Sequence, residues 1–296
     1  MTTALRGADV APSRTLFAVS DLHVSHPANR DVVAGIRAES PDDWLIVAGD
    51  VGEVLADIRE ALTSLRKRFA KVIWTPGNHE LWTHRDDPVQ LRGVARYERL
   101  IDMCRSIDVL TPEDPFPVWT GVGGPVVVAP LFLLYDYSFR APGTATKAES
   151  LAYAYRTGVV CTDELLLHAD PYPDRESWCW ARVAETERRL MAIDPALRTV
   201  LVTHWPLIRQ PTEVLHFPEF AQWCGTERTA DWHVRFRASA VLYGHLHIPR
   251  TMRVDGVRFE EVSLGYPREW QRRSDPPRVP RRVFDAASAT TGTDMS

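Results

Sequence analysis

The feature that most restricts the fold is a series of short, β-branched runs that each end in polar residues. They read RTLFAVSDLH, DWLIVAGD, KVIWTPGNHE, GPVVVAPL, RTVLVTHWP and SAVLYGHLH. Apolar runs of this length are typical of strands that are buried on both faces of a sheet. Helical patterns separate the early runs, for example EVLADIREALTSLRKRF and VQLRGVARYERLIDMCRSI. This alternation of strands and helices predicts a layered α/β fold.

Two stretches interrupt the alternation, and we expect them to be insertions over the edge of the sheet. They span about residues 131–180, rich in Tyr, Phe, Pro and Asp, and about residues 207–233, interrupted by Trp and Pro. The run TMRVDGVRFEEVSL predicts a hairpin that turns at Asp255-Gly256. Pro, Arg, Ser and Thr dominate from residue 274 onward, which predicts a disordered tail over 274–296. A single domain is therefore expected over residues 14–273.

The polar clusters at the strand ends contain residue types that bind transition metals. Because the carboxyl ends of parallel strands share one edge of a sheet, we expect these clusters to meet there. Carboxylate, imidazole and amide oxygen together suit Mn, Fe or Zn better than a calcium cage or a thiolate site. The candidate ligands are Asp21, His23, Asp50, Asn78, His204, His245 and His247. Seven ligands exceed what one ion takes, so two ions that share a carboxylate are the simplest interpretation.

Each cluster alone has a plainer interpretation. GNHE is also a plausible turn, and a lone buried histidine such as His204 is more often a hydrogen-bonded core residue. Five clusters in order, each at the end of a predicted strand, favour a common site.

The ordered set D-x-H, G-D, G-N-H-E, T-H and G-H-x-H resembles the motifs of the calcineurin-like metallophosphoesterase family, over roughly Leu16 to Ser263. The resemblance implies an α/β fold of layered β-sheets flanked by helices, with cap-like insertions, and a metal-dependent phosphoric diester hydrolase. It implies that His79 is catalytic and protonates or stabilises the leaving oxygen. It also divides the ligands: Asp21, His23 and His247 for one ion, Asn78, His204 and His245 for the other, and Asp50 for both.

Two transition-metal ions are therefore the expected cofactors, Mn or Fe first and Zn as the alternative. Glu53 in GDVGE receives no role. His26 either contacts the substrate or is an ordinary surface residue.

A narrower resemblance covers nearly the whole chain. The stretches SPDDWLIVAGDV, RFAKVIWTPGNHELW, WCGTERTADWH and YGHLHIPRT are similar to the actinobacterial phosphopantetheinyl hydrolases. These enzymes cleave the 4′-phosphopantetheine–serine phosphodiester of carrier proteins, which implies a holo acyl or peptidyl carrier protein as substrate. A nucleotide phosphodiesterase, cyclic or linear, is the alternative, because no base-recognition motif excludes it. A non-catalytic scaffold is disfavoured because His79 and all seven ligands are present.

Aromatic residues of the insertions have two open interpretations: they line a groove for a slender, partly apolar arm, or they form the core of a cap. They are Tyr135, Tyr137, Phe139, Trp205, Phe217, Trp223 and Trp232.

Charge and composition exclude several classes of function. A net charge of −4 does not favour wholesale nucleic-acid binding. The four scattered cysteines contain no C-x-x-C pair, which argues for reduced thiols. No apolar run is long enough to span a membrane and the first residues lack an apolar leader, so we expect a cytoplasmic protein without a membrane partner.

The arginines are unevenly distributed. Residues 235–282 contain eleven arginines and five acidic residues, a net charge of +6. Carrier proteins are acidic around the modified serine, so Arg250, Arg268, Arg272 and Arg273 are candidates for a docking face. A solvated basic tail is the alternative, and it is preferred for three of the arginines: Arg278, Arg281 and Arg282.

Overall fold

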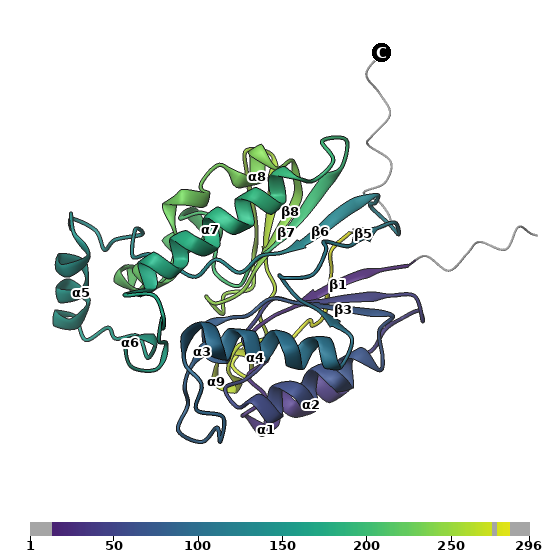
Figure 1. The fold of residues 1–296 in the computed structure, drawn as a ribbon, viewed down its shortest axis with the longest axis horizontal. Coiled ribbons are helices and arrows are strands. Elements are labelled where there is room, and N and C mark those ends of the chain that lie inside the picture. Colours follow the sequence, from purple (N-terminus) through teal and green to yellow (C-terminus); the bar gives the residue numbers. More distant parts are fainter. Residues whose placement is uncertain (1–13, 274–276, 285–296) are drawn as a thin grey trace, which may run out of the picture.

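The computed structural model describes residues 14–273 and 277–284, which form two stacked β-sheets between layers of helices (Figure 1). The first sheet has the order β11-β1-β2-β3-β4, and the second has the order β5-β6-β7-β8-β10-β9. The strands of the first sheet are β1 (Leu16–Val19), β2 (Trp44–Val47), β3 (Lys71–Trp74), β4 (Val109–Leu110) and β11 (Arg281–Arg282). Those of the second are β5 (Val118–Trp119), β6 (Val126–Pro130), β7 (Arg198–Val202), β8 (Ala238–Tyr243), β9 (Thr251–Val254) and β10 (Val257–Glu261).

Helices cover the outer face of each sheet. The helices against the first sheet are α1 (Pro27–Gly35), α2 (Leu55–Arg66) and α4 (Gly93–Ser106), and those against the second are α7 (Arg175–Met191) and α8 (Trp232–Arg235) (Figure 1). The apolar positions of α2 face inward: Ile58, Leu62 and Leu65 are fully buried. This arrangement confirms the layered α/β fold predicted from the alternation of strands and helices.

Each central strand is buried on both faces because its two faces pack against different layers. In β1, Leu16 and Ala18 join an apolar cluster built from strands of both sheets, which therefore lies between the sheets. Phe17 and Val19 belong instead to the larger cluster that contains the helix residues. β1, β2, β3 and β4 pair in parallel, as do β6, β7, β8 and β10, so both sheets direct carboxyl ends of strands to one edge.

The predicted hairpin is confirmed, whereas the predicted tail contains an ordered strand. β9 and β10 pair antiparallel around Asp255 and Gly256, both of which have positive φ. Residues 281–282 form β11 antiparallel to β1, and the Val283 side chain is buried between the sheets. The prediction of disorder is therefore wrong for these residues, because a short edge strand needs only backbone pairing and one buried side chain. Residues 274–276 and 285–296 of the predicted tail lie outside the described part of the chain.

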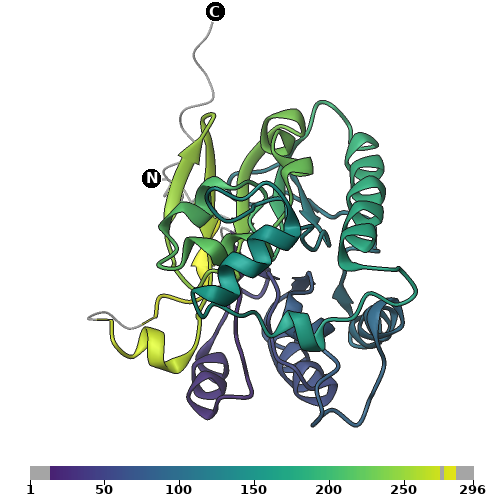
Figure 2. The same cartoon turned by 90° about the vertical axis from the view of Figure 1, so that its left-hand side faces the viewer.

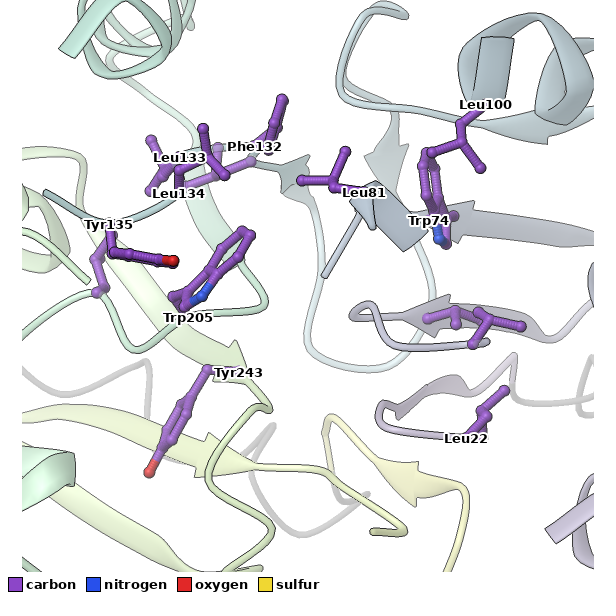
Figure 3. Close-up of a cluster of buried hydrophobic side chains, with 14 of the residues drawn as sticks. Leu22, Trp74, Leu81, Leu100, Phe132, Leu133, Leu134, Tyr135, Trp205 and Tyr243 are labelled. Carbon is purple, nitrogen blue, oxygen red and sulfur yellow. The ribbon is translucent and has the colours of Figure 1, made fainter. Parts of the chain in front are cut away.

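Both insertions lie toward the edge where the parallel strands end (Figure 2). Their helices are α5 (Lys147–Arg156), α6 (Asp163–Leu166) and the 3₁₀ turns η1 (Gln210–Val214), η2 (Pro218–Trp223) and η3 (Glu227–Thr229). The rings of Tyr135 and Trp205 lie near one another (Figure 3), with centroids 6.2 Å apart, and both side chains are buried. Of the seven aromatic residues for which the sequence left a groove or a core open, only Phe217 is accessible, at 53% exposed; the other six are buried in the large apolar cluster, which favours the core interpretation.

The four cysteines are free and buried. Among the described residues, none of the helices combines the length and the apolar character needed to cross a membrane.

Candidate active site

The polar strand-end loops of both sheets converge on one edge. Asp21 follows β1, Asp50 follows β2, and α3 (Asn78–Leu81) follows β3, all in the first sheet. His204 follows β7 and His245 follows β8 in the second sheet. Backbone hydrogen bonds from Ser20 N to Val262 O (3.0 Å) and from Leu264 N to Ser20 O (2.9 Å) join the two sheets here. Motifs far apart in sequence are thereby brought to one place.

Several of these loops hold their residues in an uncommon backbone conformation. Asp21, His23, Asp50, His245 and His247 all have positive φ, between 40° and 72°. Residues other than glycine adopt this conformation at a cost, and such strain collects at functional sites. In addition, a Cβ at residue 244 would overlap the Asp21 carboxylate, so the loop after β8 requires glycine there.

The first ligand set consists of Asp21, His23 and His247, and the Asp50 carboxylate lies beside it. His247 Nε2 lies 3.0 Å from Asp21 Oδ1 and 3.1 Å from His23 Nε2. Asp50 Oδ2 is 3.9 Å from His23 Nε2. Ligand atoms of these four residues all lie within 4.8 Å of one another, which is close enough for one metal ion.

A second ligand set, defined as Asn78, His204 and His245, lies on the other side of Asp50. Asn78 Oδ1 is 3.1 Å from His204 Nε2 and 3.2 Å from His245 Nδ1, and these two nitrogens are 3.2 Å apart. Asp50 Oδ2 is 3.4 Å from His204 Nε2. The same carboxylate oxygen of Asp50 therefore faces both sets, which is the arrangement that a bridging ligand requires.

The spacing within the two sets fits transition-metal ions. An ion bound about 2.1 Å from each ligand leaves adjacent octahedral ligands about 3.0 Å apart. In each set two imidazole nitrogens face one another, at 3.1 Å for His23 and His247 and 3.2 Å for His204 and His245. Two neutral imidazoles in this position cannot both present lone pairs without repulsion unless a proton or a cation lies between them. The donor types, nitrogen and oxygen without thiolate, suit Mn, Fe or Zn.

Burial and neighbouring charges divide the four histidines: they lower the pKa of His23 and His245, whereas the Asp50 carboxylate raises that of His204 to about 9 and the Asp21 carboxylate raises that of His247. Burial, reinforced by His79 and His247, lowers the pKa of His23 to about 3. Burial, reinforced by His204, lowers the pKa of His245 to about 3. Both imidazoles are therefore neutral at pH 7, which is the form that binds metal. Burial favours the neutral acid of Asp21, but the opposing attraction of His247 holds its pKa at about 2, so the carboxylate is ionised.

Contacts behind the ligands fix their orientation. His204 Nδ1 lies 2.9 Å from Ala48 O and donates to this carbonyl, which directs its Nε2 to the site. Glu269 Oε2 lies 2.9 Å from His247 Nδ1 and plays the same part for that imidazole. Glu80, the last residue of GNHE, accepts from the backbone N–H groups of Asp50 (2.9 Å) and Gly77 (2.9 Å) and so joins the two loops.

Asn78 is oriented by the first insertion. Its Nδ2 donates to Asp163 Oδ1 at 2.9 Å, and Trp82 Nε1 donates to the same oxygen at 2.6 Å. Because the amide nitrogen is engaged there, Asn78 Oδ1 faces His204 and His245. Neither Asp163 nor Glu269 was indicated by the sequence, since each is a single acidic residue without a recognisable motif.

Glu53, which received no role from the sequence, orients His79. His79 Nδ1 lies 2.7 Å from Glu53 Oε1, and His79 N donates to Asp50 Oδ1 at 2.9 Å. Arg96 of α4 holds the loop by donating to Glu53 O at 2.7 Å. Burial alone would lower the pKa of His79, but Asp50 and Glu53 outweigh it and raise this pKa. These two carboxylates therefore favour the protonated form of His79, and its Nε2 is directed away from Glu53.

The remaining candidates lie outside the two ligand sets. His26 is exposed, and its ring lies edge-on to Tyr266 with centroids 5.5 Å apart. Arg268, Arg272 and Arg273 are all exposed, and Arg273 also donates to His247 O, at 3.2 Å, in the loop after β8. Arg281 forms an ion pair with Glu260, with 3.5 Å between nitrogen and oxygen, so it is not part of a solvated tail as the sequence predicted.

Comparisons with known proteins identify the family of this chain. The family described as calcineurin-like phosphoesterase matches residues 14–249. The [acyl-carrier-protein] phosphodiesterase PptH of Mycobacterium tuberculosis (strain ATCC 25618 / H37Rv) is 58% identical over 264 residues, 89% of this chain and 82% of that protein. The crystal structure of phosphopantetheinyl hydrolase (PptH) from Mycobacterium tuberculosis superposes with a TM-score of 0.91 at 56% identity, covering 93% of this chain and 97% of that one.

Proposed function

Because the chain belongs to the calcineurin-like phosphoesterase family, we propose that it is a metal-dependent phosphodiesterase that removes the 4′-phosphopantetheine arm from the serine of holo carrier proteins. The observation that carries the reaction class is Asp50, whose Oδ2 faces two sets of nitrogen and oxygen ligands. The substrate is taken from the similarity to PptH over 89% of the chain.

The two ligand sets would hold two metal ions, one in each set, with Asp50 shared. Such ions, when bound, polarise a phosphoryl group and supply a nucleophile at neutral pH. We propose Mn and Fe as the metals, with Zn as the alternative, because the ligands are imidazole, carboxylate and amide oxygen.

His79 would serve as the general acid. It contacts Glu53 through Nδ1, and its Nε2 lies 3.8 Å from Asp50 Oδ2, so this nitrogen faces the space beside the bridging carboxylate. A proton on Nε2 can pass to the serine oxygen as its bond to phosphorus breaks. Glu53 keeps the imidazole in the orientation and protonation state that this transfer needs.

The test is to incubate the metal-loaded protein with a holo acyl carrier protein and to measure the intact mass of the carrier. We expect the apo carrier and free 4′-phosphopantetheine, which places the cleavage on the serine side of the phosphate. Cyclic and linear nucleotide diesters serve as competing substrates. An untouched carrier protein together with rapid nucleotide turnover would instead favour a nucleotide phosphodiesterase.

A non-catalytic scaffold would turn over no diester at all. The intact His79–Glu53 pair argues against this alternative. A scaffold has no use for an imidazole whose Nδ1 is held 2.7 Å from a carboxylate oxygen. The cytoplasmic location expected from the sequence stays a prediction.

A further inference from the structure

The segment that follows the second sheet crosses the candidate active site. We call Ser263–Trp270, which ends in α9 (Pro267–Trp270), the C-terminal strap. Gly265 N donates to Asp21 O at 3.1 Å, and Trp270 Nε1 donates to Asn29 Oδ1 at 2.9 Å. The latter contact attaches α9 to α1, and the two helices are neighbours in Figure 2. The strap is therefore held at both ends, which gives its middle residue a fixed position.

That middle residue is Tyr266. Its ring stacks on His23, with centroids 4.4 Å apart and planes inclined by 23°, and meets His247 edge-on at 4.8 Å. Tyr266 N donates to Glu269 Oε2 at 2.8 Å, and this is the carboxylate oxygen that contacts His247. The tyrosine thus covers the first ligand set from the outside and is only partly buried.

The hydroxyl of Tyr266 points toward the space in front of the proposed acid. The Tyr266 hydroxyl oxygen lies 3.4 Å from His79 Nε2. This separation exceeds the 2.5–3.2 Å of ordinary hydrogen bonds, so the hydroxyl is not committed to the imidazole. The opposite nitrogen of His79 is engaged by Glu53, which fixes Nε2 on the side of Tyr266. Two donors, a hydroxyl and an imidazole N–H, therefore border the same space next to Asp50 Oδ2.

We propose that Tyr266 is a catalytic residue whose hydroxyl donates a hydrogen bond to a non-bridging phosphoryl oxygen of the bound diester, beside His79. This inference rests on the proposed function, since it concerns the same site. A stacking ring alone would explain the contact with His23, but phenylalanine would provide that equally well. What the ring does not explain is a hydroxyl placed at the substrate-facing edge of His79. In the transition state of phosphoryl transfer, negative charge is spread over the equatorial phosphoryl oxygens, so a fixed donor aimed at one of them stabilises the transition state more than the substrate.

The test is Tyr266→Phe, which keeps the stacked ring and removes only the hydroxyl. We expect metal content and melting temperature to match the wild type. With an activated nitrophenyl diester, kcat should fall roughly 10²-fold, the lower end for a lost oxyanion donor, while KM changes little. Binding of inorganic phosphate to the metal-loaded protein, measured by calorimetry, should weaken several-fold. Tyr172→Phe is the matched control, because Tyr172 stacks on Trp178 away from the site, and it should behave as wild type.

Three results would overturn the role of Tyr266: an unchanged kcat in Tyr266→Phe, a rise in KM alone, or loss of metal. The last would mean that the hydroxyl supports the ligands and does not act on the substrate. Failure of the proposed function looks different: the wild-type protein would then cleave neither carrier protein nor nitrophenyl diester. Phosphate binding would still decide the role of the hydroxyl in that case, since that comparison needs no turnover.

Discussion

Asp163 lies in the first insertion, yet its Oδ1 accepts hydrogen bonds from Asn78 Nδ2 (2.9 Å) and Trp82 Nε1 (2.6 Å). Asp163 is fully buried, so water cannot take over either bond without rearrangement. Replacing it by alanine leaves two buried donors without an acceptor, and each such donor costs about 1–3 kcal/mol. Burial of the carboxylate itself costs free energy, and this desolvation raises the pKa of Asp163. The substitution removes that cost, which offsets part of the loss. We therefore expect Asp163→Ala to lower the free energy of unfolding by about 2–4 kcal/mol.

The larger consequence concerns metal binding. Without Asp163 the Asn78 amide can turn its nitrogen toward His204 and His245, and the second ligand set loses an oxygen. Loss of a contact of this kind typically weakens metal affinity 10–100-fold. The test is dialysis against chelator at graded concentrations, followed by elemental analysis. Asp163→Ala should lose one of its two ions at a chelator concentration about 10–100-fold lower than the wild type does. Asp163→Asn retains an acceptor oxygen and should keep both ions.

Asp43 offers a matched control for stability. It is also fully buried, and it accepts backbone N–H groups from Thr15 and Ser40, both at 2.8 Å, before the start of β2, the opposite end of that strand from Asp50. Asp43→Ala should destabilise the protein to a similar degree but keep its metals. The reasoning would be refuted if Asp163→Ala kept both ions at wild-type affinity, or if Asp43→Ala lost metal as readily.

Three further predictions concern the ligands, the acid and the partner. Asp50→Asn should lower metal content more than replacement of any residue that faces one ligand set only, because Asp50 Oδ2 faces both; a single ion per chain at full activity would contradict this. His79→Ala should keep both ions and slow cleavage of a diester with a poor leaving group, such as a serine alkoxide, by roughly 10²–10⁴-fold, and slow an activated nitrophenyl diester less. Equal losses on both substrates would argue against an acid role. Arg272→Glu should raise KM for the carrier protein at 0.1 M salt, where the Debye length is about 10 Å, with little effect at 1 M, where it is about 3 Å, and none on the nitrophenyl diester. Arg273→Glu should impair cleavage of both substrates, because Arg273 donates to His247 O at 3.2 Å. An effect confined to the carrier protein would instead indicate that Arg273 belongs to the docking face.

The seven candidate ligands and His79 could be found from the sequence because their signals are local. Each lies directly after a short apolar run, and a parallel sheet brings the ends of such runs to one edge. A pattern of a few residues is therefore enough to place Asp50 or His245 at that edge. The division into two ligand sets came from the family resemblance, and the distances around Asp50 Oδ2 agree with it.

The contacts that orient the site were not predictable in this way. Asp163 is 85 residues from Asn78, and Glu269 is 22 residues from His247. Nothing in the local sequence separates these acids from others in the chain. The hydroxyl of Tyr266 was equally hidden, since its position depends on how the strap is tied to β1 and α1.

The sequence by itself determined which strands are buried and which polar side chains follow them, because hydrophobic periodicity and strand-end chemistry are properties of neighbouring residues. Only the tertiary structure decided that the strands divide into two sheets and that Val283 packs into the core between them. It also decided that Trp205 is buried and does not line a groove. These outcomes depend on which surfaces meet across long stretches of chain. The partner of a buried polar atom is chosen by that packing, so the tautomers and orientations of the site histidines are decided there as well.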